Sequence, residues 1–181
     1  MEVALFMLAT ALLVAVSWRS LGHQRSHGFY RLFAFEGILI LVLLNAHAWF
    51  RDPLSPPQLV SWGLLLVSAL LPVLGFRQLR VAGGPRTGSS RGPEYRFERT
   101  SELVTSGVYR YIRHPLYASL FYGTWGALLK EVSWLTGAVA GATSLLIYIT
   151  ARVEERENLA RFGESYQNYR RRTKMFIPYI Y

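Results

Sequence analysis

The sequence predicts an all-α integral membrane protein with five transmembrane helices and an amphipathic cytoplasmic helix near the C-terminus. Hydrophobic residues make up 51% of the 181 residues, yet the formal net charge is +9. The apolar residues gather in five segments, and the basic residues gather between alternate pairs of them. A chain of this length is one domain. Because it has no cysteine, disulfides, thiolate metal sites and cysteine nucleophiles are excluded, and we predict no metal site.

Each apolar segment is expected to form a membrane helix. The segments cover residues 3–18, 32–50, 59–76, 116–129 and 132–150. A span needs about 20 apolar residues, within a range of about 17–25. The second, third and fifth segments reach that length, whereas the first and fourth need flanking residues or a thin bilayer. The first segment lacks the basic start and cleavage site of a signal peptide, so we expect it to stay as a helix. A tight turn at Lys130 and Glu131 makes the last two a hairpin.

The positions of the basic residues predict the orientation of these helices. Of the 20 Lys and Arg residues, 18 lie after the first segment, after the third segment or in the C-terminal part. Cytoplasmic connections carry such an excess. The N-terminus is therefore expected outside and the C-terminus in the cytoplasm, with the protein in the inner membrane.

This topology divides the chain into four parts. Three helices occupy residues 1–76, a cytoplasmic connection 77–115, a transmembrane hairpin 116–150 and a cytoplasmic helix with its tail 151–181. Residues 83–94 are polar and rich in glycine, which indicates a flexible excursion. In the last part, Tyr148, Arg152, Glu155, Leu159, Phe162 and Tyr166 recur at steps of three or four. This spacing indicates one helical face, with a bend expected at Gly163.

Residues 106–117, SGVYRYIRHPLY, combine three tyrosines, two arginines and one histidine. A residue before proline is disfavoured in a helix, whereas proline suits the first helical turn. We therefore expect His114 to be the last residue outside a helix that Pro115 opens. The unpaired amides and positive dipole end of that helix favour an anion beside His114. A basic interfacial loop that only ends a membrane helix is the alternative.

A second polar cluster, formed by Arg152, Glu154 and Glu155, follows the fifth apolar segment. The predicted hairpin brings it beside His114 on the cytoplasmic side. A ligand with an amino-acid group, a sugar diol and a cationic centre would find partners there, and S-adenosylmethionine has all three. Carboxylates suit hydroxyl and ammonium groups, and aromatic rings attract a sulfonium.

The two clusters together resemble a known family. GVYRYIRHPLY, followed by RVEERENLARFGESY and a terminal Ile-Pro, is similar to the isoprenylcysteine carboxyl methyltransferases. This family belongs to a wider group of integral-membrane, S-adenosylmethionine-dependent methyltransferases that includes phospholipid methyltransferases. The resemblance covers residues 79–178. The asparagine and histidine of the eukaryotic members are absent from the connection before the motif.

The resemblance implies roles for particular residues. Cofactor binding is implied for Tyr109, Arg113, His114, Pro115, Tyr117, Glu154 and Glu155. The position of Arg152 faces the reacting carboxylate in family members. A second catalytic arginine ends the preceding membrane helix in an L-R-x-A element, which corresponds here to Arg80, with Arg77 as a rival.

The implied function is transfer of a methyl group from S-adenosylmethionine, leaving S-adenosylhomocysteine, to a lipophilic small-molecule or prenylated acceptor at the membrane, with membrane lipids as further partners. The resemblance makes the carboxylate of a prenylcysteine-type substrate the first expectation. Such an acceptor needs no general base, because a carboxylate is already an anion at neutral pH. The alternatives are a phospholipid amine or small thiol as acceptor, an NADPH-dependent sterol-type reductase with a similar R-H-P-x-Y element, and a non-enzymatic scaffold.

Two further groups are interpreted from their place along the chain. The basic run Arg170–Arg172 favours an anchor on the inner leaflet, and we predict no nucleic-acid partner. Glu36 lies inside the second apolar segment, where a carboxyl group is costly. It is expected either to have a functional role or to reach Arg31 at the cytoplasmic face.

Overall fold

The computed structural model describes residues 2–21, 26–82 and 102–180, so the predicted excursion at 83–94 lies outside the described residues. The helices are α1 (Glu2–Leu21), α2 (His27–Leu44), η1 (Ala46–Ala48), α3 (Pro56–Ala82), η2 (Gly107–Arg110), α4 (Pro115–Leu128), α5 (Trp134–Phe162) and α6 (Glu164–Arg172). Within these ranges the only β-type pairing is an isolated bridge between Ile112 and Lys174. The prediction of an all-α protein is confirmed.

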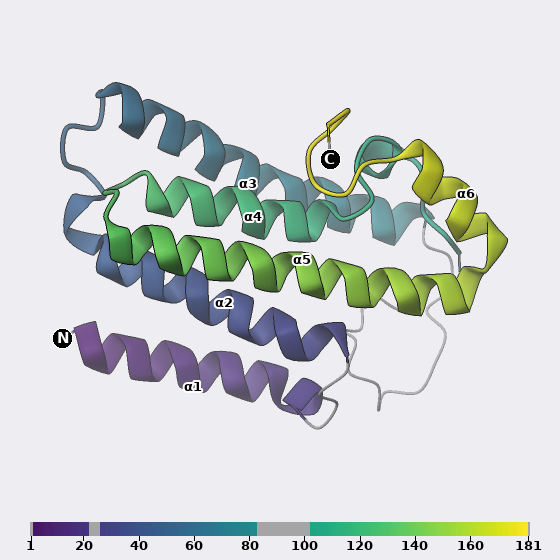
Figure 1. Ribbon diagram of the computed structural model, residues 1–181, viewed down its shortest axis with the longest axis horizontal. Helices are drawn as coiled ribbons and strands as arrows, with labels where there is room; N and C mark the ends of the chain where they lie inside the picture. Colours follow the sequence, from purple (N-terminus) through teal and green to yellow (C-terminus); the bar gives the residue numbers. More distant parts are fainter. Residues whose placement is uncertain (1, 22–25, 83–101, 181) are drawn as a thin grey trace.

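The five long helices lie side by side in one bundle, in the order α3, α4, α5, α2 and α1 across the view of Figure 1. Helix α3 packs on α4, α2 packs on α5, and α1 packs on α2. The α2–α3 connection and the α4–α5 turn lie at one end of the bundle (Figure 1). The start of α4, the end of α5 and α6 lie at the other, which places the two polar clusters together.

Three helices, α2, α3 and α5, are long and apolar enough to cross a membrane. The protein is therefore a membrane protein. Helix α4 has 14 residues, and the apolar stretch Phe6–Trp18 within α1 is also short, so the five-span topology stays a prediction. At 1.5 Å per residue α3 is about 40 Å long, which exceeds the roughly 30 Å hydrocarbon layer.

Local signals determine where the helices of the hairpin begin. Pro115 is the first residue of α4, and His114 before it has φ −124° and ψ 62°, so this predicted boundary is confirmed. Helix α5 begins after Ser133. The Ser133 hydroxyl accepts a hydrogen bond from the Thr136 amide, and the Thr136 hydroxyl accepts one from the Ser133 amide. This reciprocal cap stops the preceding turn from continuing as helix, and the predicted turn at Lys130 is confirmed.

Two helices extend beyond the apolar segments that predicted them. Helix α3 continues past Phe76 to Ala82, so Arg77 and Arg80 lie on a helix rather than in a connection; basic residues are favourable in the last turn of a helix. Helix α5 continues to Phe162 and stops at Gly163, whose φ of +57° is accessible to glycine at little cost. The predicted bend there is confirmed, whereas the amphipathic and cytoplasmic character of α6 stays a prediction.

Glu36 lies deeper along its helix than the sequence suggested, because α2 begins at His27 instead of residue 32. The Thr10 hydroxyl of α1 donates to Glu36 Oε2 at 2.9 Å. The other carboxyl oxygen is buried and has no hydrogen-bond partner among the described residues. Thr10 is therefore a partner of Glu36, and the expected contact with Arg31 stays a prediction.

Helices α2 and α5 approach most closely where Gly37 meets Thr143. A Cβ atom added to Gly37 would lie 2.1 Å from Thr143 Oγ1 and 3.1 Å from Thr143 Cβ. Rotating the threonine hydroxyl would not relieve the second contact. Glycine at this position therefore allows the two helices to pack.

Replacing Gly37 with alanine is expected to destabilise the bundle by about 1–3 kcal/mol, as overpacking does, despite the higher helix propensity of alanine. Thermal unfolding in detergent measures this. Gly141→Ala on α5 is the control, because no atom lies within 4 Å of its added Cβ. Thr143→Ala should rescue the Gly37 variant in part; equal melting temperatures for the two single variants would contradict the packing argument.

Candidate active site

A cavity of about 90 Å³ lies where the start of α4 meets the end of α5. This is several times the space that one water molecule requires. Residues from α3, the connection before α4, α4, α5 and α6 surround it. The lining residues are Leu79, Glu102, Leu103, Val104, Tyr109, Arg113, His114, Pro115, Leu116, Tyr117, Glu154, Asn158, Phe162, Tyr166 and Tyr169.

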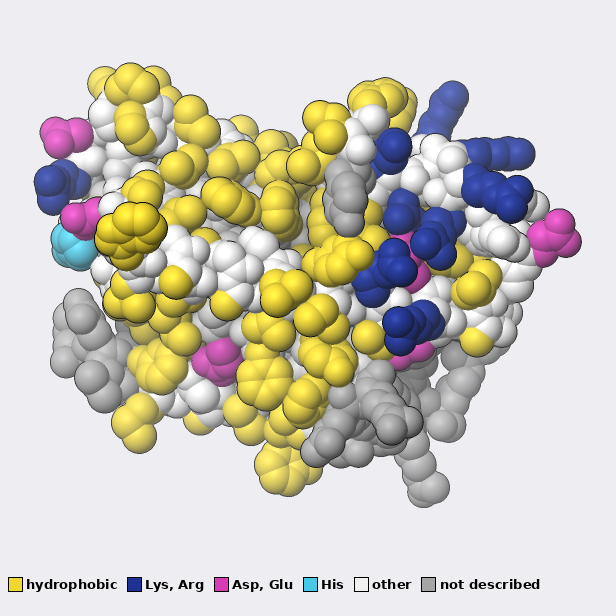
Figure 2. Space-filling view, viewed as in Figure 1, with side chains coloured by type: hydrophobic (Ala, Val, Ile, Leu, Met, Phe, Trp, Pro, Cys, Tyr) yellow, Lys and Arg dark blue, Asp and Glu magenta, His cyan; other side chains and the backbone are white. Residues whose placement is uncertain are grey.

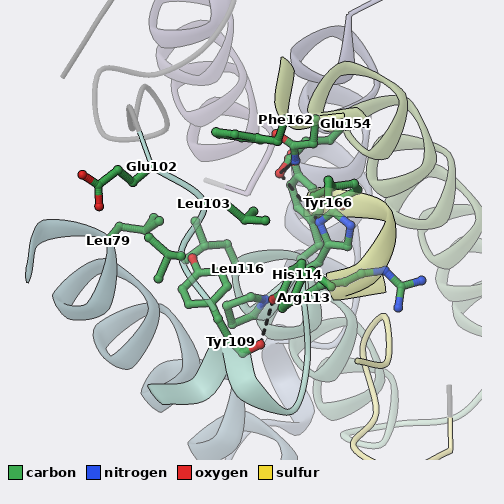
Figure 3. A pocket seen from close by; sticks show the side chains of 15 residues that line it. Leu79, Glu102, Leu103, Tyr109, Arg113, His114, Leu116, Glu154, Phe162 and Tyr166 are labelled. Carbon is green, nitrogen blue, oxygen red and sulfur yellow. Dashed lines mark hydrogen bonds and ion pairs between the residues drawn. The ribbon is translucent and has the colours of Figure 1, made fainter. Parts of the chain in front are cut away.

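The cavity has a mostly apolar wall and a mostly polar wall (Figure 3), with Glu102 beside Leu79 on the first and Phe162 beside Glu154 on the second. Leu79, Leu103 and Leu116 form an apolar wall on the side of α3. Glu154 and Tyr166 lie on the opposite side, toward α5 and α6. A ligand that carries both an apolar part and several polar groups matches this division.

A buried carboxylate organises the polar wall. Glu155 is only 3% exposed, and its Oε1 accepts from Arg113 Nε. Arg170 Nε lies 3.6 Å from Glu155 Oε2, and His114 Nε2 lies 3.7 Å from Glu155 Oε1. On its other side, His114 Nδ1 lies 3.7 Å from Glu154 Oε1. The imidazole is thus held between two carboxylates, with basic groups compensating the buried charge.

The C-terminal segment holds the backbone that carries these groups. The Arg113 amide donates to the Lys174 carbonyl at 2.9 Å, and the His114 amide donates to the Met175 carbonyl at 3.3 Å. Arg113 Nη1 donates to the Thr173 carbonyl at 2.8 Å. Residues after α6 therefore fix the position of the imidazole and guanidinium from behind.

Two tyrosines of α6 complete the polar wall. Burial raises the pKa of the Tyr166 hydroxyl, and the negative charges of Glu155 and Glu154 raise it further. Burial likewise raises the pKa of the Tyr169 hydroxyl, which donates to the Tyr109 carbonyl at 2.7 Å. Both phenols therefore stay protonated at neutral pH and can donate a hydrogen bond, as the Tyr169 hydroxyl does.

The structure brings most of the predicted cofactor-binding residues together. Those that line the cavity are Tyr109, Arg113, His114, Pro115, Tyr117 and Glu154. Glu155 adjoins them through its contact with Arg113. Their roles in binding stay predictions.

The two arginines predicted to be catalytic do not line the cavity. Arg152 is half-buried, and its guanidinium carbon lies 5.9 Å from the centre of the Tyr148 ring. Arg80 is exposed near the end of α3, one residue after Leu79, which does line the cavity. Arg77 is exposed as well. The catalytic roles of these arginines stay predictions.

Sequence reasoning did not assign the remaining lining residues to the site. These are Leu79, Glu102, Leu103, Val104, Leu116, Asn158, Phe162, Tyr166 and Tyr169. Helical spacing had already placed Phe162 and Tyr166 on the face of Glu155, and Asn158 follows Glu154 by one turn. Helical periodicity alone could therefore have assigned these three residues to the site. No comparable signal marks Glu102 and Leu103, which lie outside helices.

The buried His114 Nε2 atom and the buried Tyr166 hydroxyl form no hydrogen bond within the described structure. The carboxylate oxygen nearest to His114 Nε2 among the described residues is Glu155 Oε1, at 3.7 Å. Buried polar groups are nearly always paired. A ligand with both hydrogen-bond donors and acceptors fits this pair of atoms, and a nucleoside carrying an amino-acid group has both.

The protein thus combines an apolar helical bundle with a partly polar cavity at one end, an arrangement typical of a membrane protein that binds a ligand. The family model described as phospholipid methyltransferase matches residues 59–165. The chain belongs to this family.

Three individual relatives of the chain are also named as methyltransferases. The chain is 38% identical over 125 residues to a methanethiol S-methyltransferase of Crocosphaera subtropica, a match that covers 67% of this chain and 44% of that protein. It is 34% identical over 128 residues to the protein-S-isoprenylcysteine O-methyltransferase of Homo sapiens, covering 68% and 45%. The match to the Mus musculus protein of that name is 32% over 127 residues, covering 68% and 45%. The aligned part is thus less than half of each relative. No solved structure matches the chain.

Replacing Glu155 with glutamine is expected to destabilise the fold by about 3–5 kcal/mol, because Arg113 would keep a buried charge without its partner. Unfolding by heat or denaturant in detergent measures the loss. Glu164→Gln, an exposed carboxyl at the start of α6, is the control and should change stability little. A Glu155 variant as stable as this control would show that the buried ion pair does not hold the site together.

Proposed function

We propose that the protein is a membrane methyltransferase that uses S-adenosylmethionine and releases S-adenosylhomocysteine. The observation that carries the proposal is the cavity where the start of α4 meets the end of α5. Its lining combines polar and apolar residues and includes His114 and Tyr166, each with a buried polar atom that forms no hydrogen bond within the described structure. Membership of the phospholipid methyltransferase family supports it.

The residues of the polar wall would hold the cofactor. The Glu154 carboxylate can accept from hydroxyl or ammonium groups, and the Tyr166 hydroxyl can donate to a ligand oxygen or nitrogen. The Tyr109 and Tyr117 rings can attract a cationic sulfur. The predicted partners Arg113, Pro115 and Glu155 orient these groups. Bound S-adenosylmethionine supplies a methyl group on a positively charged sulfur.

The charges around the cavity favour a neutral acceptor such as a small thiol over a carboxylate. Among its described lining residues Arg113 is the only Lys or Arg, and it already donates to Glu155 and Thr173. Glu102 and Glu154 add negative charge. The apolar wall of Leu79, Leu103 and Leu116 suits an uncharged apolar group. The names of the methanethiol S-methyltransferase relatives agree with this acceptor class. The second candidate acceptor is a prenylcysteine carboxylate bound by Arg152 and Arg80.

A thiol acceptor requires the removal of a proton, because an unperturbed thiol has a pKa of about 8.5. The buried His114 Nε2 atom has no hydrogen-bond partner in the described structure and can receive that proton. The neighbouring carboxylates of Glu154 and Glu155 would stabilise the imidazolium that results. A carboxylate acceptor would need no such step.

The same proposal places the site on the cytoplasmic side of the inner membrane. Figure 2 shows Lys and Arg side chains gathered at the end of the molecule formed by α6 and the end of α5. Hydrophobic side chains cover much of the middle of this face. The basic end is the one that the positive-inside rule assigns to the cytoplasm, and the lipophilic acceptor would enter from the bilayer.

Calorimetry in detergent tests the cofactor. Wild-type protein is expected to bind S-adenosylhomocysteine, and His114→Ala should weaken binding at least tenfold because the imidazole lies within the polar wall. His47→Ala, at the opposite end of the bundle, is the matched control and should bind normally. Binding of NADPH in place of S-adenosylhomocysteine would overturn the proposal in favour of reduction, and binding of neither would favour a scaffold.

Transfer of a labelled methyl group tests the acceptor. We expect turnover with a small alkanethiol, and expect Arg152→Ala to keep both turnover and affinity for S-adenosylhomocysteine. Farnesylcysteine and phosphatidylethanolamine are the competing acceptors. If farnesylcysteine is methylated and Arg152→Ala abolishes that turnover while cofactor affinity is kept, the carboxylate is the acceptor and Arg152 orients it.

A further inference from the structure

A second cavity lies at the end of the bundle opposite the candidate active site. It has a volume of about 330 Å³ and is formed by the α2–α3 connection and the α4–α5 turn. Charged side chains of both signs line it, namely Arg51, Asp52, Lys130 and Glu131. Figure 2 shows such a mixed group at this end of the molecule.

Lys130 is one of the lining residues, and it is only 4% exposed. Its Nζ donates to Gln58 Oε1 at 3.0 Å and lies 3.3 Å from the centre of the Trp62 ring and 5.2 Å from that of Trp49. Gln58 Nε2 donates in return to the Lys130 carbonyl at 3.1 Å. The ammonium is therefore held in one place by an amide and two indoles.

None of these neighbours brings a negative charge. Within the described ranges the Lys130 ammonium forms no ion pair, and burial lowers the pKa of this group. Buried charges are usually paired, because leaving water without compensation is costly. An ammonium has three donors, so Lys130 keeps donor capacity for an anionic group in the adjoining cavity.

The other charged residues of the cavity limit which ligands can carry the anionic group that Lys130 would bind. Glu131 Oε2 lies 2.5 Å from His47 Nε2, and this contact joins the two chain segments that form the cavity. Arg51 and Asp52 are exposed at its rim, so the four charged lining residues sum to zero. A ligand with a second negative charge would be repelled by Asp52, whereas one with a compensating cation would not.

We propose that this cavity binds the headgroup of a zwitterionic phospholipid from the outer leaflet. The phosphate would lie between Lys130 and Arg51, and the ammonium would face Asp52. The position agrees with this source, because the cavity is at the membrane boundary of the bundle, where tryptophans such as Trp49 and Trp62 concentrate. The site is remote from the proposed methyl-transfer cavity and does not depend on it.

Native mass spectrometry and thermal unfolding of delipidated full-length protein in detergent test the proposal. The probes are dioleoyl phosphatidylethanolamine, dioleoyl phosphatidylglycerol and inorganic phosphate, each added separately. We expect one saturable molecule of phosphatidylethanolamine to bind at least tenfold more tightly than phosphatidylglycerol, and expect inorganic phosphate not to reproduce its effect on the melting temperature.

Variants separate this site from general lipid binding. Lys130→Met should weaken phosphatidylethanolamine binding at least tenfold, and Arg51→Ala, a substitution at the exposed rim that is less prone to disturb folding, should weaken it several-fold. Arg156→Ala, exposed at the opposite end, should have no effect. Equal binding of the two lipids, equal binding by wild type and the Arg51 variant, or an effect of inorganic phosphate as large as that of the lipid would overturn the proposal.

Discussion

The buried contact between Arg113 and Glu155 is the interaction on which the candidate site depends. It joins the connection before α4 to the far end of α5, and the same guanidinium donates to Thr173 after α6. One side chain thus ties three separate segments together. Because each charge would be costly without the other, these segments are fixed relative to one another. His114, next to Arg113, is thereby placed between Glu154 and Glu155.

The lengths of the helices decide where such polar contacts can exist. Helix α5 has 29 residues and is about 43 Å long, so its last turns extend beyond a hydrocarbon layer of roughly 30 Å. The two glutamates lie in these last turns of α5. The site therefore has polar groups toward the end of α5 and an apolar wall toward α3.

Most of the helices and part of the cavity lining could be predicted from the sequence, because these depend on signals within short stretches. Hydropathy marked the helices, proline marked the start of α4 at Pro115, and glycine marked the break at Gly163. The contacts of the C-terminal segment could not be predicted, since the Arg113 and His114 amides donate to backbone carbonyls, which carry no side-chain signature. Arg152 shares a helical period with Glu155, yet periodicity alone does not determine which neighbouring ring or cavity its long side chain approaches.

The short helix α4 connects the two ends of the molecule. Its 14 residues cover about 21 Å, less than the roughly 30 Å of the hydrocarbon layer. Such a helix places polar backbone ends close to apolar surroundings, where unpaired groups are costly. A buried ionisable side chain lies at each end of α4 and contacts a residue of another helix. At the start of α4, His114 lies beside Glu155 of α5. At its end, Lys130 donates to Gln58 of α3. The polar groups at the two ends of this short helix are the same groups that the two proposals assign to ligand binding.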